Sequence, residues 1–316
     1  MSPQLLAVTD LAASVRREAI REIEAIRGRK HPVAVAAVLV GDCPLTTRLL
    51  ADRGRACQEA EVDFVTHAFP VNANPAEVEA RLADLSNDPQ TTGLLLALAP
   101  EAGPGEARLT RAMAPQKDLA GEHPAWLADL LAPDGQHRNP RLAAVLATLE
   151  THEIDLYDRA ITVVGHATRL GWPLGAMLSH RHAAAITVVP PADTLPAGAL
   201  VTADVLILHG VAPGVIGPDR VREGATVLDL SPSGPAGGDE PAPSALHPDA
   251  AARAGRLLPA GGLAPLEEAL FLRNVATAAR EAEAAFLRLG ARTSTPGRGD
   301  SPPERGRGPE GRDPRK

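Results

Sequence analysis

Aromatic side chains are scarce in this chain: Phe, Trp and Tyr together make up 2% of its 316 residues. Hydrophobic residues still account for 44%, so a sizeable core can form from Ala, Leu and Val. Such a core offers little aromatic surface on which a nucleobase or a pterin can stack. The composition thus argues against a site built on ring stacking.

Cysteine is also rare, and basic residues are fewer than acidic ones. The chain has two cysteines, Cys43 and Cys57, which excludes a disulfide framework. No metal-ligand spacing surrounds them, so we expect two ordinary buried thiols and no metal site. The formal net charge of −7 argues against a general nucleic-acid binder, which needs a basic face.

Long apolar runs are missing as well. No segment reaches the length that spans a membrane. The opening segment, MSPQLLAVTDLAASV, lacks the basic stretch and following apolar stretch of a secretory signal. We therefore expect a cytoplasmic protein with no membrane partner.

What the chain does have is a regular alternation of apolar strands and amphipathic helices. This alternation predicts an α/β fold with parallel sheets. In the first half, helices are expected at 10–29, 44–60 and 74–88, and strands at 33–42, 62–70 and 91–100.

A second unit follows a helix expected at 139–154. Its strands are expected at 161–164, 184–189, 203–211 and 224–231, and a last helix at 265–289. The tail, 290–316, is rich in Pro, Gly, Arg and Ser and buries too little apolar surface to become ordered.

Six segments occur in an order that resembles the bifunctional methylenetetrahydrofolate dehydrogenase/cyclohydrolase family. They are VAVAAVLVGDCPLTTRLLADRGRACQEAEV, TTGLLLALAP, PQKDLAGEHP, VVGHATRLGWPL, ADVLILHGVAPGVI and LPAGGLAPLEEAL. A single Gly-rich turn is weak evidence, but six segments in series are strong. The resemblance runs from about Asp10 to Leu289.

The resemblance implies a folate-facing N-terminal α/β domain, residues 1–135, and a Rossmann-like NAD(P)-binding domain, residues 136–264. It also implies that the last helix returns to the first domain. The implied reactions are NADP-dependent oxidation of methylenetetrahydrofolate and hydrolysis of the methenyl product. NADP or NAD and a tetrahydrofolate derivative are the implied ligands, and a homodimer is the implied assembly.

The positions that the family uses for catalysis are altered in the first domain. The family carries a Tyr and, four residues later, a Lys that handles the proton of the hydrolytic step; here these positions are Leu49 and Arg53. Arginine keeps the charge but is a poor general acid or base, because its pKa stays above about 12. We expect Arg53 to be a solvated or ion-paired surface residue. The family's Gln in the third strand is Ala97, expected to face a packed helix.

The segment PQKDLAGEHP matches the family's pterin-binding loop. Lys117 and Asp118 remain, whereas the Asp that accepts hydrogen bonds from the pterin is Ala120. Losing such a carboxylate costs about 1.5–3 kcal/mol for each charge-assisted hydrogen bond. The resemblance places Lys117 in the substrate site, but we expect Lys117 and Asp118 to fix the loop.

The turn after the first Rossmann strand corresponds to the family's phosphate-binding turn. Gly165 and Gly171 keep its backbone shape, whereas the Arg and Ser that hold phosphates are His166 and Ala167. A neutral histidine holds phosphate poorly, and Arg169 is a possible substitute.

The second Rossmann strand ends in Pro190-Pro191-Ala192-Asp193, where the family has a polar run. The prolines remove backbone donors, and Asp193 repels a 2′-phosphate, which favours NAD over NADP.

The segment LPAGGLAPLE matches the family's last site segment. Gly261, Gly262 and Pro265 survive there as candidate substrate-site residues. Glu267 replaces a Thr at the start of the last helix, where its charge suits the helix dipole without any ligand.

Two interpretations follow from these substitutions. In the first, the protein is a catalytically impaired member of the fold that acts as a binding or regulatory subunit, paired with itself or with an active relative. In the second, it is an enzyme, either an active NAD(P)-dependent methylenetetrahydrofolate dehydrogenase with or without cyclohydrolase activity, or an enzyme with an altered substrate. The losses at Leu49, Arg53, Ala97 and Ala120 favour the first, and the retained Rossmann glycines favour a remaining nucleotide site.

Overall fold

The structure is a computed structural model of the chain. It describes residues 2–29, 32–99, 105–130, 138–180, 185–191, 195–232 and 243–293. Asp193 and residues 294–316 of the expected tail lie outside the described residues.

The first domain is built on a three-stranded parallel sheet in the order β3-β2-β4. Its strands are β2 (Ala34–Val40), β3 (Asp63–Phe69) and β4 (Gly93–Leu98), connected by α2 (Pro44–Glu59) and α3 (Pro75–Asn87). Alternate residues of β2 enter different cores: Val35 and Ala37 face the layer with α2, and Ala36 and Val38 face the layer with α3. Burial on both faces explains why these strands are continuously apolar.

The second domain holds a six-stranded parallel sheet in the order β1-β9-β8-β7-β5-β6. Its strands are β1 (Gln4–Leu5), β5 (Ala160–Val164), β6 (Ala185–Val189), β7 (Val205–Leu208), β8 (Thr226–Asp229) and β9 (Arg256–Leu258). One face packs against α6 (Pro140–Thr151) and α7 (Trp172–Ser179). The other face packs against α8 (Ala197–Val201) and α9 (Pro248–Ala251). The expected α/β fold with two parallel sheets is confirmed.

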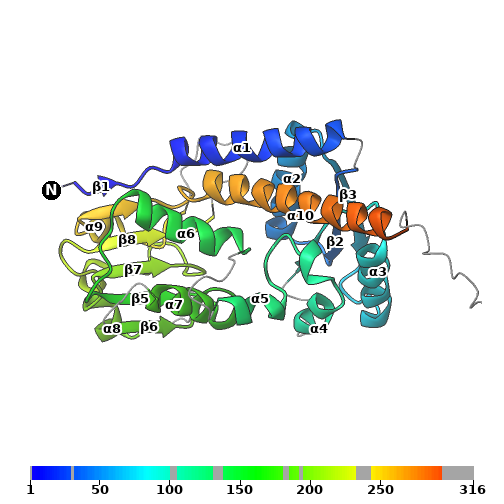
Figure 1. Ribbon diagram of the computed structural model, residues 1–316. Coiled ribbons are helices and arrows are strands. Elements are labelled where there is room, and N and C mark those ends of the chain that lie inside the picture. Colours follow the sequence, from blue (N-terminus) through cyan, green and yellow to red (C-terminus); the bar gives the residue numbers. More distant parts are fainter. Residues whose placement is uncertain are drawn as a thin grey trace, which may run out of the picture.

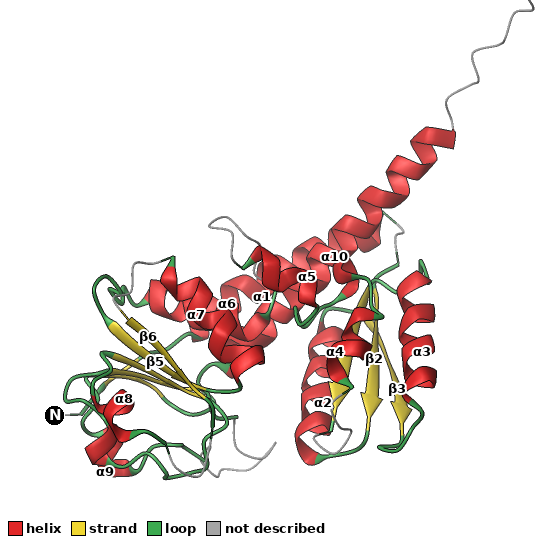
Figure 2. Ribbon diagram, turned by 90° about the horizontal axis from the view of Figure 1, so that it is seen from below, coloured by secondary structure: helices red, strands yellow, loops and turns green. Residues whose placement is uncertain are grey.

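Two long helices, α1 (Thr9–Gly28) and α10 (Ala264–Thr293), lie side by side across both domains (Figure 1). Leu266 and Leu270 of α10 belong to the core of the second domain, whereas Phe271 and Val275 belong to the core of the first. Seen from below, α10 runs on past the first sheet (Figure 2). The last helix therefore does return to the first domain, as expected.

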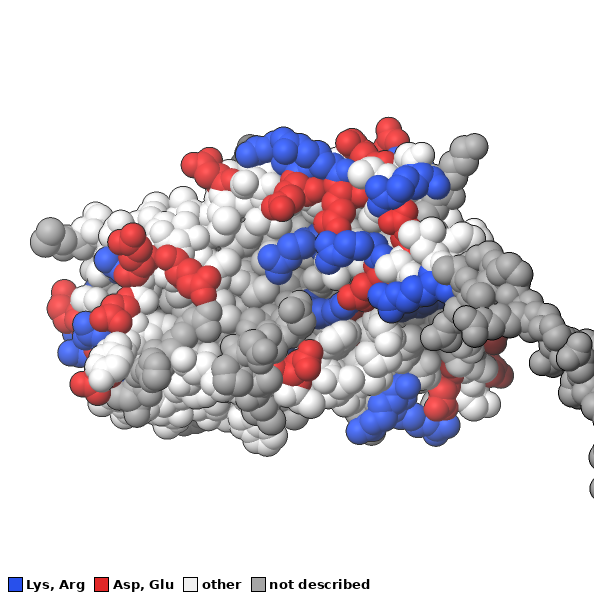
Figure 3. Space-filling model, viewed as in Figure 1, with Lys and Arg blue, Asp and Glu red and all other residues white. Residues whose placement is uncertain are grey.

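Ion pairs join the exposed sides of these helices. Arg16 pairs with Glu268, Arg29 with Glu283, and Arg280 with Glu22. Charged side chains of both signs gather over this part of the surface (Figure 3). Such exposed pairs contribute little stability each, so the apolar contacts beneath them hold the helices together. Among the described helices, none is both long enough and apolar enough to cross a membrane.

Shorter elements complete the first domain and the junction. They are α4 (Glu106–Arg111), a 3₁₀ turn at Pro115–Lys117 and α5 (Pro124–Asp129). Asn274 of α10 donates to the carbonyls of Leu119 and Arg138, so one buried amide ties together the two segments where the chain passes between domains.

Gly121 lies where the backbone of the loop comes close to the backbone at Asn139. Its φ is +65°, and a Cβ at this position would lie 2.3 Å from the backbone nitrogen of Asn139. We predict that Gly121→Ala lowers the free energy of unfolding by at least about 1 kcal/mol, because an L side chain is strained there and also collides with backbone. Urea denaturation measures this change.

Gly105→Ala is the matched control, because nothing lies within 4 Å of its added Cβ. Equal effects of the two substitutions would contradict the assigned backbone geometry.

Candidate functional site at the domain junction

Helix α2 presents Leu49 and Arg53 on one face, as the four-residue spacing predicts. Leu49 is 42% exposed, whereas Arg53 is only 9% exposed. The expectation that Arg53 is a solvated or ion-paired surface residue is therefore wrong. A long apolar stem allows a charged side chain to be covered in this way.

The Arg53 guanidinium lies over the ring of Phe271, 4.8 Å from its centroid. Within the described part of the chain, this guanidinium has no hydrogen-bond partner and no carboxylate within 4.0 Å. Burial lowers the pKa of Arg53 from its ordinary value, and the nearby acids Glu267 and Glu268 act against that shift. The group is thus a buried cation held by a ring contact.

Glu267 lies one helical turn before Phe271 on the same face of α10. Its carboxylate accepts two hydrogen bonds from Arg141 of α6, from Nε at 2.8 Å and from Nη2 at 3.3 Å. Burial acts to raise the pKa of Glu267, but pairing with Arg141 outweighs it, and the pKa is lowered. Glu267 therefore has a structural partner in addition to its favourable place in the helix dipole.

His209 continues this network from the end of β7. Arg141 Nη1 lies 2.7 Å from His209 Nε2. Since arginine can only donate, Nε2 accepts, and the proton of the neutral ring sits on Nδ1. Nδ1 is buried and has no hydrogen-bond partner among the described residues. Burial, helped by the positive charge of Arg141, lowers the pKa of His209 to about 4, which keeps the ring neutral near pH 7.

The remaining family positions in the first domain are occupied by structural groups. Ala97 is 4% exposed and belongs to the apolar core of β4, α2 and α10. Asp118 is buried, and its carboxylate accepts hydrogen bonds from the backbone N–H groups of Ala120, Gly121 and His123. Burial raises the pKa of Asp118 although these hydrogen bonds act in the opposite direction.

Lys117 is also used by the fold. Its Nζ donates to the carbonyls of Leu85 and Asp88 at the end of α3, at 3.3 and 2.6 Å. These contacts support the interpretation that Lys117 and Asp118 fix the loop. Ala120 lies half-buried within the turn that Asp118 organises.

In the second domain the glycine turn follows β5. Gly165 N donates to Val189 O of β6, and residues Ala167–Gly171 form a single wide helical turn before α7. A Cβ would lie 2.7 Å from Leu170 at Gly165 and 2.4 Å from Val188 at Gly171. Both glycines are needed for close packing of the turn.

His166 and Arg169 are exposed on this turn, at the carboxyl end of the sheet. The side chain of Ala167 and the whole of Asp193 lie outside the described residues. Gly261 has a φ of +75° and donates from its N–H to Ser231 O, and a Cβ on Gly262 would lie 2.8 Å from Pro259 O. Pro265 is exposed in the first turn of α10.

The structure therefore brings Arg53, Arg141, His209 and Glu267 into one charged network between the domains, defined here as the junction cluster. Arg141, His209 and Phe271 were not among the site residues predicted from the sequence. Arg141 directly follows a helix-capping Asn-Pro pair, and His209 ends an apolar strand; such positions suit a site but occur too often to identify one. Within the described residues, no group of three or more His, Cys, Asp or Glu is placed to hold a metal ion.

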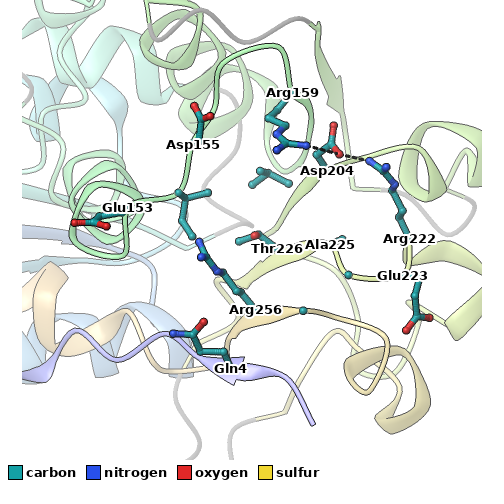
Figure 4. A pocket seen from close by; sticks show the side chains of 14 residues that line it. Gln4, Glu153, Asp155, Arg159, Asp204, Arg222, Glu223, Ala225, Thr226 and Arg256 are labelled. Carbon is teal, nitrogen blue, oxygen red and sulfur yellow. Dashed lines mark hydrogen bonds and ion pairs between the residues drawn. The ribbon is translucent and has the colours of Figure 1, made fainter. Parts of the chain in front are cut away.

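A separate pocket of about 470 Å³ lies at the amino ends of the strands of the second sheet. In it Asp204 pairs with Arg159 and Arg222, and Arg256 and Gln4 line another side (Figure 4). Dinucleotides bind at the carboxyl ends of parallel strands, so this pocket is not the place where the glycine turn would hold a cofactor.

Two family models match most of the chain. The model of the tetrahydrofolate dehydrogenase/cyclohydrolase catalytic domain matches residues 6–120, and that of the NAD(P)-binding domain matches residues 141–283. A bifunctional protein FolD of Synechococcus sp. is 33% identical over 78% of this chain and 85% of its own length. This chain belongs to the tetrahydrofolate dehydrogenase/cyclohydrolase family. FolD 1 of Rubrobacter xylanophilus is 30% identical over 88% of this chain and 97% of its own length.

Solved structures of this family share the fold. A FolD structure from Campylobacter jejuni has a TM-score of 0.76 at 20% identity, covering 89% of this chain and 99% of its own. A Trypanosoma brucei FolD complexed with NADP and an inhibitor has a TM-score of 0.76 at 18% identity, covering 89% and 98%.

The pKa of His209 predicts a specific pH dependence of stability. An unfolded histidine has a pKa of about 6.5, whereas His209 in the folded protein has a pKa of about 4. Its contribution to stability is therefore complete above pH 6.5 and is lost as the pH falls toward 4, because the unfolded state takes up the proton first. Urea denaturation at pH 7 and pH 4.5 should show a larger loss for the wild type than for His209→Gln.

The variant keeps an acceptor for Arg141 but has no titrating ring, and every other titrating group is common to both proteins. Parallel pH curves for the two proteins would contradict the burial of a neutral His209.

Proposed function

We propose that this protein is a catalytically impaired member of the family, which retains a dinucleotide site but lacks cyclohydrolase activity, and that it acts as a binding or regulatory subunit. The observation that carries the proposal is Arg53. It occupies the family's Lys position, is buried over Phe271 and carries a guanidinium in place of an amine.

Hydrolysis of a methenyl group needs a side chain that gives and takes a proton near neutral pH. A lysine amine can serve, because burial can bring its pKa toward neutrality. A guanidinium stays protonated even when burial lowers its pKa. Arg53 can therefore hold or orient an anion but cannot carry the proton of this step.

The substrate side of the site is reduced as well. Ala97 is packed in the core and offers no side-chain donor or acceptor. Ala120 has no carboxylate, and the neighbouring Asp118 carboxylate already accepts three backbone hydrogen bonds. Neither residue can replace the paired hydrogen bonds that a pterin requires, which supports weak binding of folate.

The dinucleotide side is better preserved. The close-packed glycines Gly165 and Gly171 keep the turn, and His166 and Arg169 stand exposed at its rim. These features support retention of a site for NADP or NAD, and Asp193 of the sequence favours NAD. We further propose a cytoplasmic protein that pairs with itself or with a related subunit.

The intact glycine turn also favours a second candidate, an active NAD(P)-dependent dehydrogenase that has lost only the hydrolytic step, or an enzyme with an altered substrate. Hydride transfer depends mainly on how the dinucleotide and the folate are positioned relative to each other. Loss of the Lys alone therefore does not abolish it. A dehydrogenase assay with methylenetetrahydrofolate and either dinucleotide separates this candidate from the first, which predicts no reduced dinucleotide.

The first prediction of the proposal concerns hydrolysis. Methenyltetrahydrofolate in the presence of the purified protein should decay at the rate of the buffer control, because Arg53 cannot transfer the proton. Decay of the methenyl absorbance measures this rate. Arg53→Ala is the paired variant: a protein-dependent rate in the wild type that this variant abolishes would refute the proposal.

The second prediction concerns the cofactor. Isothermal titration should show NAD binding more tightly than NADP, because Asp193 repels a 2′-phosphate and His166 lacks a permanent charge. Asp193→Ser should reduce the difference between the affinities for NAD and NADP. Asp219→Ser, at an exposed turn distant in sequence, should leave that difference unchanged. Tighter binding of NADP than of NAD by the wild type would contradict the proposed preference of the dinucleotide site.

A further inference from the structure

We propose that the junction cluster binds a small oxyanion, a carboxylate or a phosphate, between Arg53 and His209. The inference rests on the proposed function, because it takes Arg53 as a fixed charge and not as a proton carrier. It names a class of ligand for a place where the family's proton-handling residue is missing.

Among the described residues, the charges around Arg53 leave this cation without an ion-pair partner. Each nearby acid is already engaged: Glu267 with Arg141, Glu268 with Arg16, and Asp52 with Arg48 and Arg55. The four-membered junction cluster contains two arginines and one glutamate, with His209 neutral. It therefore carries an excess positive charge, and that charge is on the guanidinium of Arg53, a residue that is nine-tenths buried.

The hydrogen-bond donors of the cluster also favour an anionic ligand. A guanidinium stacked on a ring still has its N–H groups at its edge, in the plane where a carboxylate or phosphate binds in bidentate fashion. Arg53 uses none of these donors within the described chain. His209 independently contributes a buried Nδ1–H without a partner. A buried donor without a partner is rare in folded proteins, and this one lies in the same network as the unpaired charge of Arg53, which favours an acceptor that comes from outside the chain.

Arg53 and His209 are connected by contacts from opposite domains. Arg53 of α2 stacks on Phe271, Glu267 lies one turn earlier on the same face, and Arg141 bridges Glu267 to His209 at the end of β7. An oxyanion bound to this cluster would contact both domains and would favour the arrangement in which they are close. Neutral ligands have no such advantage here, because the unmatched group is a charge.

The test uses full-length protein and two probes, inorganic phosphate and malonate, with sodium chloride at equal ionic strength as the reference. Melting temperature is measured against probe concentration at pH 7.5 for the wild type, Arg53→Met, His209→Phe and the control Arg55→Met. Arg55 lies on the same helix, but is exposed and paired with Asp52. Circular dichroism establishes that each variant is folded.

We expect at least one probe to raise the wild-type melting temperature in a saturable manner, and chloride not to do so. Arg53→Met should weaken binding of that probe by about tenfold or more, the loss expected for one charge-assisted contact. It should also raise the melting temperature without a probe, because methionine fits on Phe271 without a buried charge. Arg55→Met should behave as the wild type does. Phosphate acting alone indicates a phosphate ligand, and malonate acting alone indicates an organic acid.

Two results would overturn the inference: no saturable effect of either probe on the wild type, or an equal effect on folded Arg53→Met. A probe that acts equally on folded His209→Phe would remove His209 from the site and refute the two-residue assignment. The proposed function is tested by a different measurement. It would be refuted by Arg53-dependent hydrolysis of methenyltetrahydrofolate, which the anion titration does not measure.

Discussion

A single helix that belongs to two hydrophobic cores sets the geometry of this protein. The first turns of α10 are buried with α6 and α7 in the second domain, and its middle is buried with α1, α2 and β4 in the first. The backbone positions of residues on one rigid helix are fixed relative to one another. Glu267 and Phe271 therefore hold Arg141 and Arg53 at a fixed spacing, and any large movement between domains must first separate these groups from α10.

This constraint explains how an altered site can stay ordered. The substituted positions contribute to packing: Ala97 fills the core under α10, and the guanidinium of Arg53 covers the ring of Phe271. The retained Asp118 organises a loop through three backbone N–H groups. The fold thus keeps the family's two-domain frame, with paired or buried charges at the junction and apolar side chains packed around them.

Much of the frame could be predicted from the sequence. Strands buried on both faces give continuous apolar runs, and the last helix was expected at 265–289 where α10 spans Ala264–Thr293. Strands β1 and β9 were not predicted, because two and three residues are too few to show a period. The glycine turn was found because close packing permits only glycine there.

The junction was harder to predict, for a physical reason. Arginine is seldom buried, so its residue type alone suggests a solvated side chain, and only the tertiary contact with Phe271 reverses that assignment. Arg141 and His209 come from different elements and acquire their roles from each other. No local pattern reports a contact made between segments that far apart in the sequence.

The short strand β1 has a consequence for how the chain is made. Gln4 and Leu5 pair with Arg256 and Leu257, so β1 leaves the ribosome well before the strand with which it pairs at the edge of the sheet. The first domain likewise lacks its central helix until α10 has been synthesised. Neither core is complete until α10 has been made, so the last part of folding depends on contacts between segments that are distant in the sequence.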